Sequence, residues 1–241
     1  MKFAIVSDIH ANLEALEAVW NDALRLGAER FICLGDAVGY GPDPQEVISR
    51  LAISHTLTVR GNHEQAIFDP HLLRRMSHEA VVTLRHTANS ISPATRLWMS
   101  TLPRSHVEAG ARFVHGAPPQ SVLRYFTQCK GRELNSRFSL YSETVCFTGH
   151  THLQTITREQ KGKILSSLLF EGRHQLSRKV RHVVGVGSGG QPRGDGKDAE
   201  YVLWAPDNNE IQARRVPYDR EATIKKLEDL KFPATLSALL R

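Results

Sequence analysis

The chain has 241 residues, of which 41% are hydrophobic and 23% are charged, and its formal net charge is +6. This length supports a sizeable hydrophobic core, and the composition is that of an ordinary globular protein rather than a disordered one. No apolar run approaches the roughly twenty residues that a membrane-spanning helix requires, and the first strand starts so early that we expect neither a membrane segment nor a signal peptide.

The first half of the chain alternates between apolar runs and amphipathic segments. We expect strands at 2–7, 30–34 and 56–59, and helices near 12–26 and 44–53. Apolar side chains recur at helical spacing in the first helix, and a proline occupies the first turn of the second. Each strand is followed directly by Asp, Asn or His residues. This pattern predicts a polar site at the carboxyl ends of neighbouring strands, where open α/β sheets bind ligands.

A helix-rich insertion is expected next, roughly between residues 64 and 102. Its apolar residues recur at helical spacing, which favours ordinary packing in the core. The alternative is a cap that leans over the polar site and shapes a substrate pocket. Phe68, Met76 and Trp98 are the side chains that we would test first as pocket walls.

The second half of the chain is richer in β-type segments. Strands are expected at 105–107, 112–114, 145–147, 154–157, 180–186, 201–204 and 210–216. Two helices near 220–230 and 234–240 are expected to pack outside the sheets, although leucines of the last one could equally form a dimer contact. Since no repeat or linker interrupts the pattern, we predict one α/β domain over residues 1–241, with two packed sheets and helices outside them.

Five short clusters along the chain carry side chains that bind metals. They are Asp8-Ile9-His10, Gly35-Asp36, Gly61-Asn62-His63-Glu64, His115-Gly116 and Gly149-His150-Thr151-His152. Taken singly, each cluster has an ordinary explanation as a helix cap, a turn or a packed histidine. Taken together, they offer two carboxylates, an amide oxygen and several imidazoles, and this set suits two divalent cations that share a carboxylate. Asp36 is the candidate bridge, because a carboxylate offers two oxygens.

Two of the clusters place candidate ligands two positions apart. Asp8 and His10 follow the first strand, and His150 and His152 follow a later apolar run. If each strand stays extended past its end, both side chains of a pair point the same way. Asn62 can bind a cation through its carbonyl oxygen while it stays neutral. The pattern predicts a site where metal-activated water attacks a phosphate ester.

The clusters resemble the pattern DxH, GDxxG, GNH[DE], HG and GHxH of the calcineurin-like metallophosphoesterase superfamily. Segments 35–44 and 187–193 are also similar to stretches of small bacterial predicted phosphodiesterases. The similarity therefore covers most of the chain. It implies a four-layer α/β sandwich in which two mixed β-sheets are flanked by helices.

The resemblance also implies a ligand set and a mechanism. The first metal would be bound by Asp8, His10, Asp36 and His152, and the second by Asp36, Asn62, His115 and His150. His63 is implied as a proton donor or a phosphate contact rather than a ligand. A metal-bridging hydroxide would attack phosphorus directly, without a covalent intermediate. Manganese is the expected metal, and iron, nickel, zinc and cobalt are the alternatives.

One departure from the family pattern narrows the expected reaction. Phosphoprotein phosphatases and diadenosine tetraphosphatases carry an Asp-Arg pair shortly after the second motif, and Gly39 and Tyr40 occupy these positions here. His63 therefore lacks an orienting carboxylate, and an arginine clamp for phosphate is missing. We expect a phosphodiesterase that acts on a small phosphorylated or nucleotide-like substrate. The alternatives are a phosphoprotein or dinucleotide polyphosphate phosphatase, and a non-catalytic scaffold on the same fold.

The remaining signals concern partners and compartment. Lysine and arginine residues are scattered, and the densest stretch, 173–181, is typical of a solvated face, so the support for a nucleic-acid partner is weak. A glycine-rich loop at 187–196 is either a simple turn or a support that carries Arg193 toward phosphate. The three cysteines are far apart and form no CxxC motif, which predicts a reducing cytoplasm.

Overall fold

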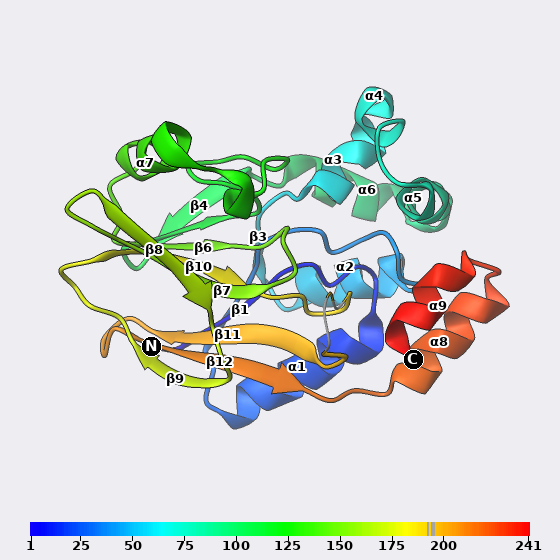
Figure 1. The fold of residues 1–241 in the computed structure, drawn as a ribbon. Coiled ribbons are helices and arrows are strands. Elements are labelled where there is room, and N and C mark those ends of the chain that lie inside the picture. The colour runs from blue at the N-terminus through cyan, green and yellow to red at the C-terminus, as the bar shows by residue number, and fades with distance from the viewer. Residues whose placement is uncertain (192, 194–195) are drawn as a thin grey trace.

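The structure is a computed structural model that describes residues 1–191, 193 and 196–241 (Figure 1). Part of the predicted loop 187–196, namely residues 192, 194 and 195, lies outside the described residues. Two six-stranded mixed sheets form the centre of the molecule. This architecture confirms the predicted α/β class with two sheets and flanking helices.

The first sheet has the strand order β3-β2-β1-β11-β12-β9. Its strands are β1 (Phe3–Val6), β2 (Arg30–Cys33), β3 (Leu57–Thr58), β9 (Gly172–Gln175), β11 (Ala199–Ala205) and β12 (Glu210–Val216). The pairs β1–β2 and β2–β3 are parallel, whereas β11 pairs with β1 and β12 in antiparallel fashion. The three parallel strands therefore end at the same edge of the sheet.

The second sheet has the order β4-β5-β6-β10-β7-β8. Its strands are β4 (Ser105–Glu108), β5 (Ala111–Val114), β6 (Val145–Thr148), β7 (Gln154–Gln160), β8 (Lys163–Leu168) and β10 (Arg181–Val186). Strand β6 is parallel to both β5 and β10. The loops after β5 and β6 consequently leave from one edge, as the loops after β1, β2 and β3 do in the first sheet.

Aromatic side chains fill the space between the two sheets. The rings of Phe113 and Phe147 stack with their centroids 5.5 Å apart, and Trp204 from the opposite sheet lies 5.3 Å from Phe147. Phe3 approaches the same tryptophan at 5.2 Å. All four side chains are almost fully buried, so their burial fixes how the sheets stack and how their loop-bearing edges align.

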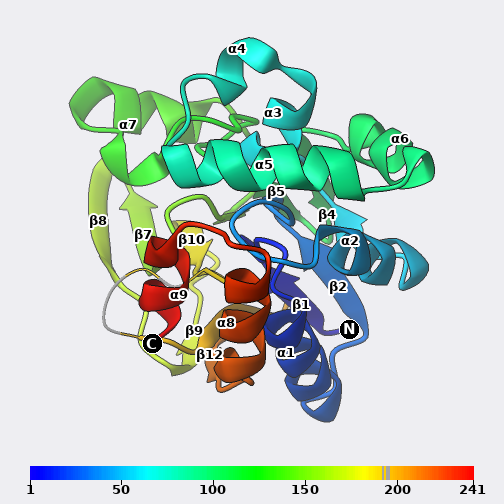
Figure 2. The same cartoon turned by 90° about the vertical axis from the view of Figure 1, so that its right-hand side faces the viewer.

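Helices cover the outer faces of both sheets (Figures 1 and 2). They are α1 (Leu13–Arg25), α2 (Pro44–Ile53), α3 (Asn62–Phe68), α4 (Pro70–Leu73), α5 (His78–Ser90), α6 (Pro93–Thr101), α7 (Gly131–Ser139), α8 (Arg220–Asp229) and α9 (Ala234–Leu240). The predicted insertion corresponds to α3–α6, which lie together at one end of the first sheet in Figure 2. None of the helices in the described part of the chain combines the length and apolar character that a bilayer crossing requires.

The elements that were not predicted from the sequence include β8, β9 and α7. Strand β8 lies at a sheet edge, where Leu165 is 72% exposed, so its side chains show no buried-face alternation. Strand β9 carries hardly any apolar residues and is fixed by pairing with β12. In α7 only Phe138 is buried. Pairing and packing with distant segments produce these elements.

The C-terminal helices pack against the rest of the chain. Leu236 and Leu240 of α9 are buried with Ile224 and Leu227 of α8, and Tyr40 packs against this cluster. Figure 2 shows α8 beside α1. The leucines that we considered for a dimer contact therefore lie largely inside the molecule.

Candidate metal centre

The five sequence clusters meet at one edge of the two sheets. Asp8 and His10 follow β1, Asp36 follows β2, Asn62 and His63 begin α3 after β3, His115 follows β5, and His150 and His152 follow β6. Each of these eight side chains belongs to a residue that is at most 8% exposed. The structure thus brings all predicted site residues together, while their roles as ligands stay predictions.

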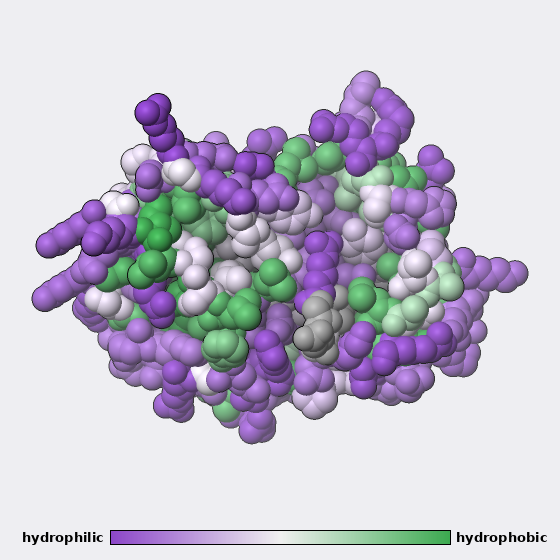
Figure 3. All heavy atoms as spheres, in the orientation of Figure 1, coloured by the Kyte–Doolittle hydropathy of each residue, from purple (hydrophilic) through white to green (hydrophobic). Residues whose placement is uncertain are grey.

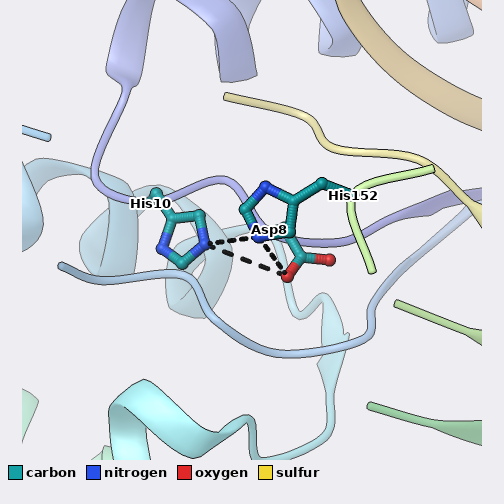
Figure 4. Close-up of side chains that lie close together, drawn as sticks. All are labelled: Asp8, His10 and His152. Carbon is teal, nitrogen blue, oxygen red and sulfur yellow. Dashed lines mark hydrogen bonds and ion pairs between the residues drawn. The ribbon is translucent and has the colours of Figure 1, made fainter. Parts of the chain in front are cut away.

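Asp8, His10 and His152 form the first group of close donor atoms (Figure 4). His152 Nε2 lies 3.2 Å from Asp8 Oδ1 and 3.2 Å from His10 Nε2. The second carboxylate oxygen of Asp8 accepts a hydrogen bond from the His150 backbone N–H at 2.9 Å. Asp8 Oδ1 has no hydrogen-bond partner in the described part of the chain. One oxygen is therefore used to fix the carboxylate, and the other faces the two imidazoles.

Asp36 connects this group to a second one. Its Oδ2 lies 3.9 Å from His10 Nε2 and 3.3 Å from His115 Nε2, while its Oδ1 accepts a hydrogen bond from the His63 backbone N–H at 2.8 Å. His115 Nε2 also lies 3.0 Å from Asn62 Oδ1 and 3.2 Å from His150 Nδ1. Asp36 is the carboxylate that both groups share, as expected of a bridge.

Backbone carbonyls set the tautomer of four of the five histidines. His10 Nδ1 lies 3.1 Å from the carbonyl of Val38, His115 Nδ1 2.9 Å from Leu34, His150 Nε2 3.1 Å from Leu123, and His152 Nδ1 2.6 Å from Gln191. A nitrogen that faces a carbonyl must carry the proton, so in a neutral ring the other nitrogen presents its lone pair. In all four residues this second nitrogen points into the cluster.

The donor set fits two divalent cations. The inward nitrogens of His10 and His152 face each other at 3.2 Å, and so do those of His115 and His150. Two lone pairs at this separation repel each other unless a proton or a metal cation shares them. Carbonyl groups bound to the outer nitrogens are the usual support of metal-binding histidines. Together with the unpartnered Asp8 oxygen, this geometry supports a dinuclear centre.

The pKa values of histidines in the cluster shift in both directions, and only that of His115 rises. Burial alone would lower the pKa of His115, but the charge and hydrogen bond of Asp36 outweigh burial and raise it to about 9. Burial, and then the neighbouring His115, lower the pKa of His150 to about 4. Burial also lowers the pKa of His10, in which His63 and His152 assist. The carboxylates thus attract positive charge to a defined point, where a cation would replace a proton.

The paired ligands converge by a different route from the one expected. The sequence suggested that Asp8 and His10, and likewise His150 and His152, lie on extended chain. Instead all four have left-handed backbone conformations, with φ of 54°, 49°, 65° and 58°. Asp36 shares this conformation at 52°. Non-glycine residues adopt it rarely and at a cost, so the chain concentrates strain at this site.

His63 differs from the other histidines of the cluster. Its Nε2 lies 3.9 Å from Asp36 Oδ2, and its Nδ1 has no hydrogen-bond partner among the described residues. Gly39 approaches this nitrogen so closely that a Cβ at position 39 would collide with it, and its φ of 81° favours glycine. The imidazole thus packs against bare backbone where related phosphatases carry an acidic side chain. Tyr40 lies beside the ring, with centroids 4.8 Å apart.

A cavity of about 360 Å³ opens over the cluster. Its walls comprise Asp36, Tyr40, Asn62, His63, Leu72, Arg75, Met76, Ser77, Leu123, Tyr125, His150, His152 and Arg193. Met76 therefore lines the cavity as expected. Phe68 and Trp98 do not: Phe68 packs under the guanidinium of Arg96, and Trp98 packs against the core of the first sheet. The insertion contributes one wall and also packs as ordinary core.

Glu64 supports the cluster although the sequence reasoning gave it no role. Its carboxylate accepts hydrogen bonds from the backbone N–H groups of Asp36 at 2.9 Å, Ala37 at 2.7 Å, Val38 at 3.3 Å and Gly61 at 2.8 Å. It is fully buried. The loop that carries Asp36 is thereby tied to the start of α3. Its place as the fourth residue of the GNHE motif was the feature of the sequence that could have indicated this role.

The fold and the clustered donors define a metallophosphoesterase. The family model for calcineurin-like phosphoesterases matches residues 1–154. The chain belongs to this family, whose members use a dinuclear metal centre and act on phosphoesters.

Known proteins resemble the chain over nearly its whole length. The uncharacterized protein MJ0912 of Methanocaldococcus jannaschii is 30% identical over 243 residues, which cover 98% of this chain and 96% of that protein. The crystal structure of a metallophosphoesterase from Sphaerobacter thermophilus is 28% identical, with a TM-score of 0.86 and coverage of 100% and 98%. The hypothetical protein PH1004 from Pyrococcus horikoshii OT3 shares the fold at 20% identity, with a TM-score of 0.76 and coverage of 99% and 97%.

Proposed function

We propose that this protein is a phosphodiesterase that depends on two divalent cations. The observation that carries the proposal is the pair of inward-facing donor groups that share Asp36. The proposed ligands are Asp8, His10, Asp36 and His152 for one cation, and Asp36, Asn62, His115 and His150 for the other. When bound, the two cations would polarise the phosphoryl group and lower the pKa of a water molecule. Manganese is the first candidate, because the carboxylate and amide oxygens of the site suit it. Iron, nickel, zinc and cobalt are the alternatives.

His63 is the proposed catalytic residue of the chain. It lines the cavity, and no backbone carbonyl of the described residues restrains its Nδ1. Burial lowers the pKa of its imidazole, and the charge of Asp36 opposes this shift only in part. An anionic phosphate arriving in the cavity would raise the pKa again and so favour the protonated ring. His63 would then donate a proton or a hydrogen bond to the leaving oxygen.

Two features support a diester rather than a phosphoprotein substrate. Gly39 and Tyr40 stand where phosphoprotein phosphatases carry an Asp-Arg pair, so neither an orienting carboxylate nor that arginine is present at these positions. In addition, Leu72, Met76 and Leu123 give the cavity apolar walls. These walls have room for the second ester group of a small, nucleotide-like phosphodiester.

The test is reconstitution of metal-free protein with one cation at a time. Each preparation is assayed on an aryl phosphodiester, an aryl phosphomonoester, cyclic nucleotides and a phosphopeptide. We expect the manganese form to have its highest kcat/KM on a diester. A higher kcat/KM on the phosphopeptide or the monoester would contradict the diester assignment. A folded protein that takes up none of these cations would favour a non-catalytic scaffold.

We further propose that the enzyme works in a reducing cytoplasm. All three cysteines, Cys33, Cys129 and Cys146, are buried and unpaired. Burial raises the pKa of the Cys129 thiol, and Glu133 adds to this effect. Such thiols are weak nucleophiles that behave as small apolar side chains.

A further inference from the structure

Two arginines line the cavity over the donor cluster from opposite parts of the chain. Arg75 lies in the turn between α4 and α5 of the insertion, and Arg193 lies between β10 and β11. Both side chains are exposed. Figure 3 shows hydrophilic side chains in the middle of this face, between the helical insertion and β7, with apolar side chains over β7 and β8. The cavity itself combines these two arginines with the apolar side chains of Leu72, Met76 and Leu123.

Neither guanidinium has a carboxylate partner within 4.0 Å among the described residues. Several other arginines of the chain are paired, as Arg112 is with Glu143 at 3.0 Å and Arg214 with Asp22 at 3.0 Å. Asp36 is the only carboxylate among the described residues that line the cavity. In the described part of the chain, no carboxylate therefore competes with a ligand for Arg75 or Arg193.

The charges of the site exceed what one phosphodiester can neutralise. With a hydroxide on the metals, two divalent cations and the carboxylates of Asp8 and Asp36 would leave about one positive charge, which one phosphodiester balances, so the charges of Arg75 and Arg193 would remain unmatched. A phosphodiester brings one negative charge. Because planar guanidinium groups bind phosphate oxygens in bidentate fashion, the surplus is best matched by a second anionic group on the substrate.

Resting on the proposed function, we propose that Arg75 and Arg193 form an anion clamp that selects phosphodiesters carrying a further phosphate beside the one hydrolysed. The clamp would do the work of the arginine that is absent at position 40, but from a different place and on a different phosphate. Tyr125, which stacks on His150 with centroids 3.8 Å apart and an interplanar angle of 11°, would offer its ring to the organic part of the substrate.

A neighbouring cavity indicates where the further phosphate binds. Arg193 also lines a second cavity of about 330 Å³, whose walls include Leu168, Phe170, Asp198 and Glu200. Arg215 also lines this cavity but is paired with Glu200 at 3.2 Å, and the carboxylates of Glu200 and Asp198 leave no excess positive charge there for an anion. The further phosphate is therefore expected on the side of Arg193 that faces Arg75, over the donor cluster.

The test compares two diesters that share a leaving group and differ by one phosphate. They are the 4-nitrophenyl ester of thymidine 5′-phosphate and the same ester phosphorylated at the 3′ hydroxyl. With the manganese enzyme, we expect kcat/KM to be about tenfold higher for the 3′-phosphorylated ester, as for one charge-assisted contact. Arg75→Met and Arg193→Met should each reduce this preference severalfold, and the double variant should abolish it.

Arg74 provides a matched control. It is the exposed neighbour of Arg75, but its guanidinium contacts His71 Nδ1 at 2.8 Å and does not line the cavity. Arg74→Met should keep the preference of the natural enzyme. Since the clamp residues are exposed, their preference should also fall as the salt concentration rises.

Binding to metal-free protein separates this proposal from the proposed function. In the presence of a chelator, the Kd of each ester is measured by calorimetry for the natural chain and for the same variants. The 3′-phosphorylated ester should bind about tenfold more tightly, and loss of either arginine should reduce the difference. Equal binding of both esters by the natural chain, or an unchanged preference in both single variants, would overturn the clamp. If the chain binds the 3′-phosphorylated ester more tightly but hydrolyses neither ester, only the phosphodiesterase proposal is overturned.

Discussion

At the scale of single residues, the histidines of the cluster divide by how their outer nitrogen is used. His10, His115, His150 and His152 each direct it to a backbone carbonyl. Such a contact locks the ring in one orientation and one tautomer, which is what a metal ligand needs. His63 has no such contact among the described residues, and its ring lies beside Tyr40. A ring without this restraint is suited to exchanging a proton with a substrate.

The first prediction follows from this difference. His63→Ala should fold normally and bind two cations, since the anchored histidines and the carboxylates stay in place. Turnover of an unactivated diester should fall by about 10²- to 10⁴-fold, the usual contribution of a general acid. Metal content and kcat are measured together. His106→Ala, at a half-buried histidine of β4 outside the cluster, is the control, and unchanged turnover in His63→Ala would remove His63 from the mechanism.

Gly39 provides a second prediction at this scale. Its φ of 81° lies in the left-handed region, and a Cβ there would collide with His63 Nδ1. Gly39→Ala should therefore cost about 1–2 kcal/mol of the free energy of unfolding for the backbone alone, and should also displace the imidazole. Both unfolding and kcat are measured. Gly110→Ala, where φ is 79° but a Cβ would meet no atom within 4 Å, isolates the backbone cost. Equal losses of kcat in both variants would contradict a specific effect on His63.

At the scale of elements, the loop after β2 depends on the first turn of α3. Glu64 accepts four backbone N–H groups, three from residues 36–38 and one from Gly61. This arrangement caps the helix and holds the backbone of Asp36 in its left-handed conformation. The Asp36 carboxylate, which both donor groups share, is therefore positioned by Glu64 through the backbone of Asp36.

Replacement of this acid gives the third prediction. Glu64→Gln keeps the shape of the side chain but offers one acceptor oxygen, while its NH₂ group faces N–H donors that it cannot satisfy. Each buried donor left without a partner costs about 1–3 kcal/mol, so the free energy of unfolding should fall by at least this amount. Denaturant unfolding measures it, and metal affinity should fall as well. The exposed Glu46→Gln of α2 is the control, and equal stability of both variants would contradict the role.

The sequence predicted these elements unequally, for physical reasons. Strands β1, β2 and β12 and helices α1 and α2 have strong apolar patterns and were placed to within a residue or two. Strand β8 has an exposed face and β9 lacks apolar residues, so their pairing partners alone define them. The left-handed backbones of Asp8 and His10 were also missed, because spacing along a sequence shows which residues are near but not how the chain turns.

At the scale of the whole molecule, the site is assembled across both sheets. Asp8, Asp36 and Asn62 come from the first sheet and its loops, and His115 and His150 come from the second. Ordered motifs were enough to predict that these residues meet. The cavity above them was less predictable: Arg75 belongs to no motif, and it reaches the cavity only because the turn between α4 and α5 lies over the sheet edge.

A buried carboxylate joins helix α1 to the first sheet. Asp22 of α1 is 7% exposed and accepts hydrogen bonds from the Tyr201 hydroxyl of β11 at 2.7 Å and from Arg214 Nε of β12 at 3.0 Å. Arg25 contacts the same carboxylate. Burial would raise the pKa of Asp22, but Arg214, Tyr201 and Arg25 together outweigh burial and lower it.

The direction of this shift sets a pH dependence of stability. The pKa of Asp22 is lower in the folded chain than in the unfolded chain, where it is about 3.9. The unfolded state then binds more protons at acidic pH, so the contribution of this carboxylate is complete above about pH 4 to 5 and is lost as the pH falls toward the folded value. The tie between α1 and the two strands should therefore weaken in acid.

Asp22→Asn tests this dependence. At pH 7 the variant should lose about 1–3 kcal/mol of the free energy of unfolding, because the half-buried Arg214 would lose its charged partner. Below pH 4 the natural chain progressively loses the same contribution, so the difference between the two proteins should shrink. Urea unfolding at pH 7, 5 and 3 measures the difference. Asp229→Asn, at an exposed carboxylate paired with Lys225, should change stability little at any pH. A difference for Asp22→Asn that stays constant from pH 7 to pH 3 would show that its ionisation is not what joins the helix to the sheet.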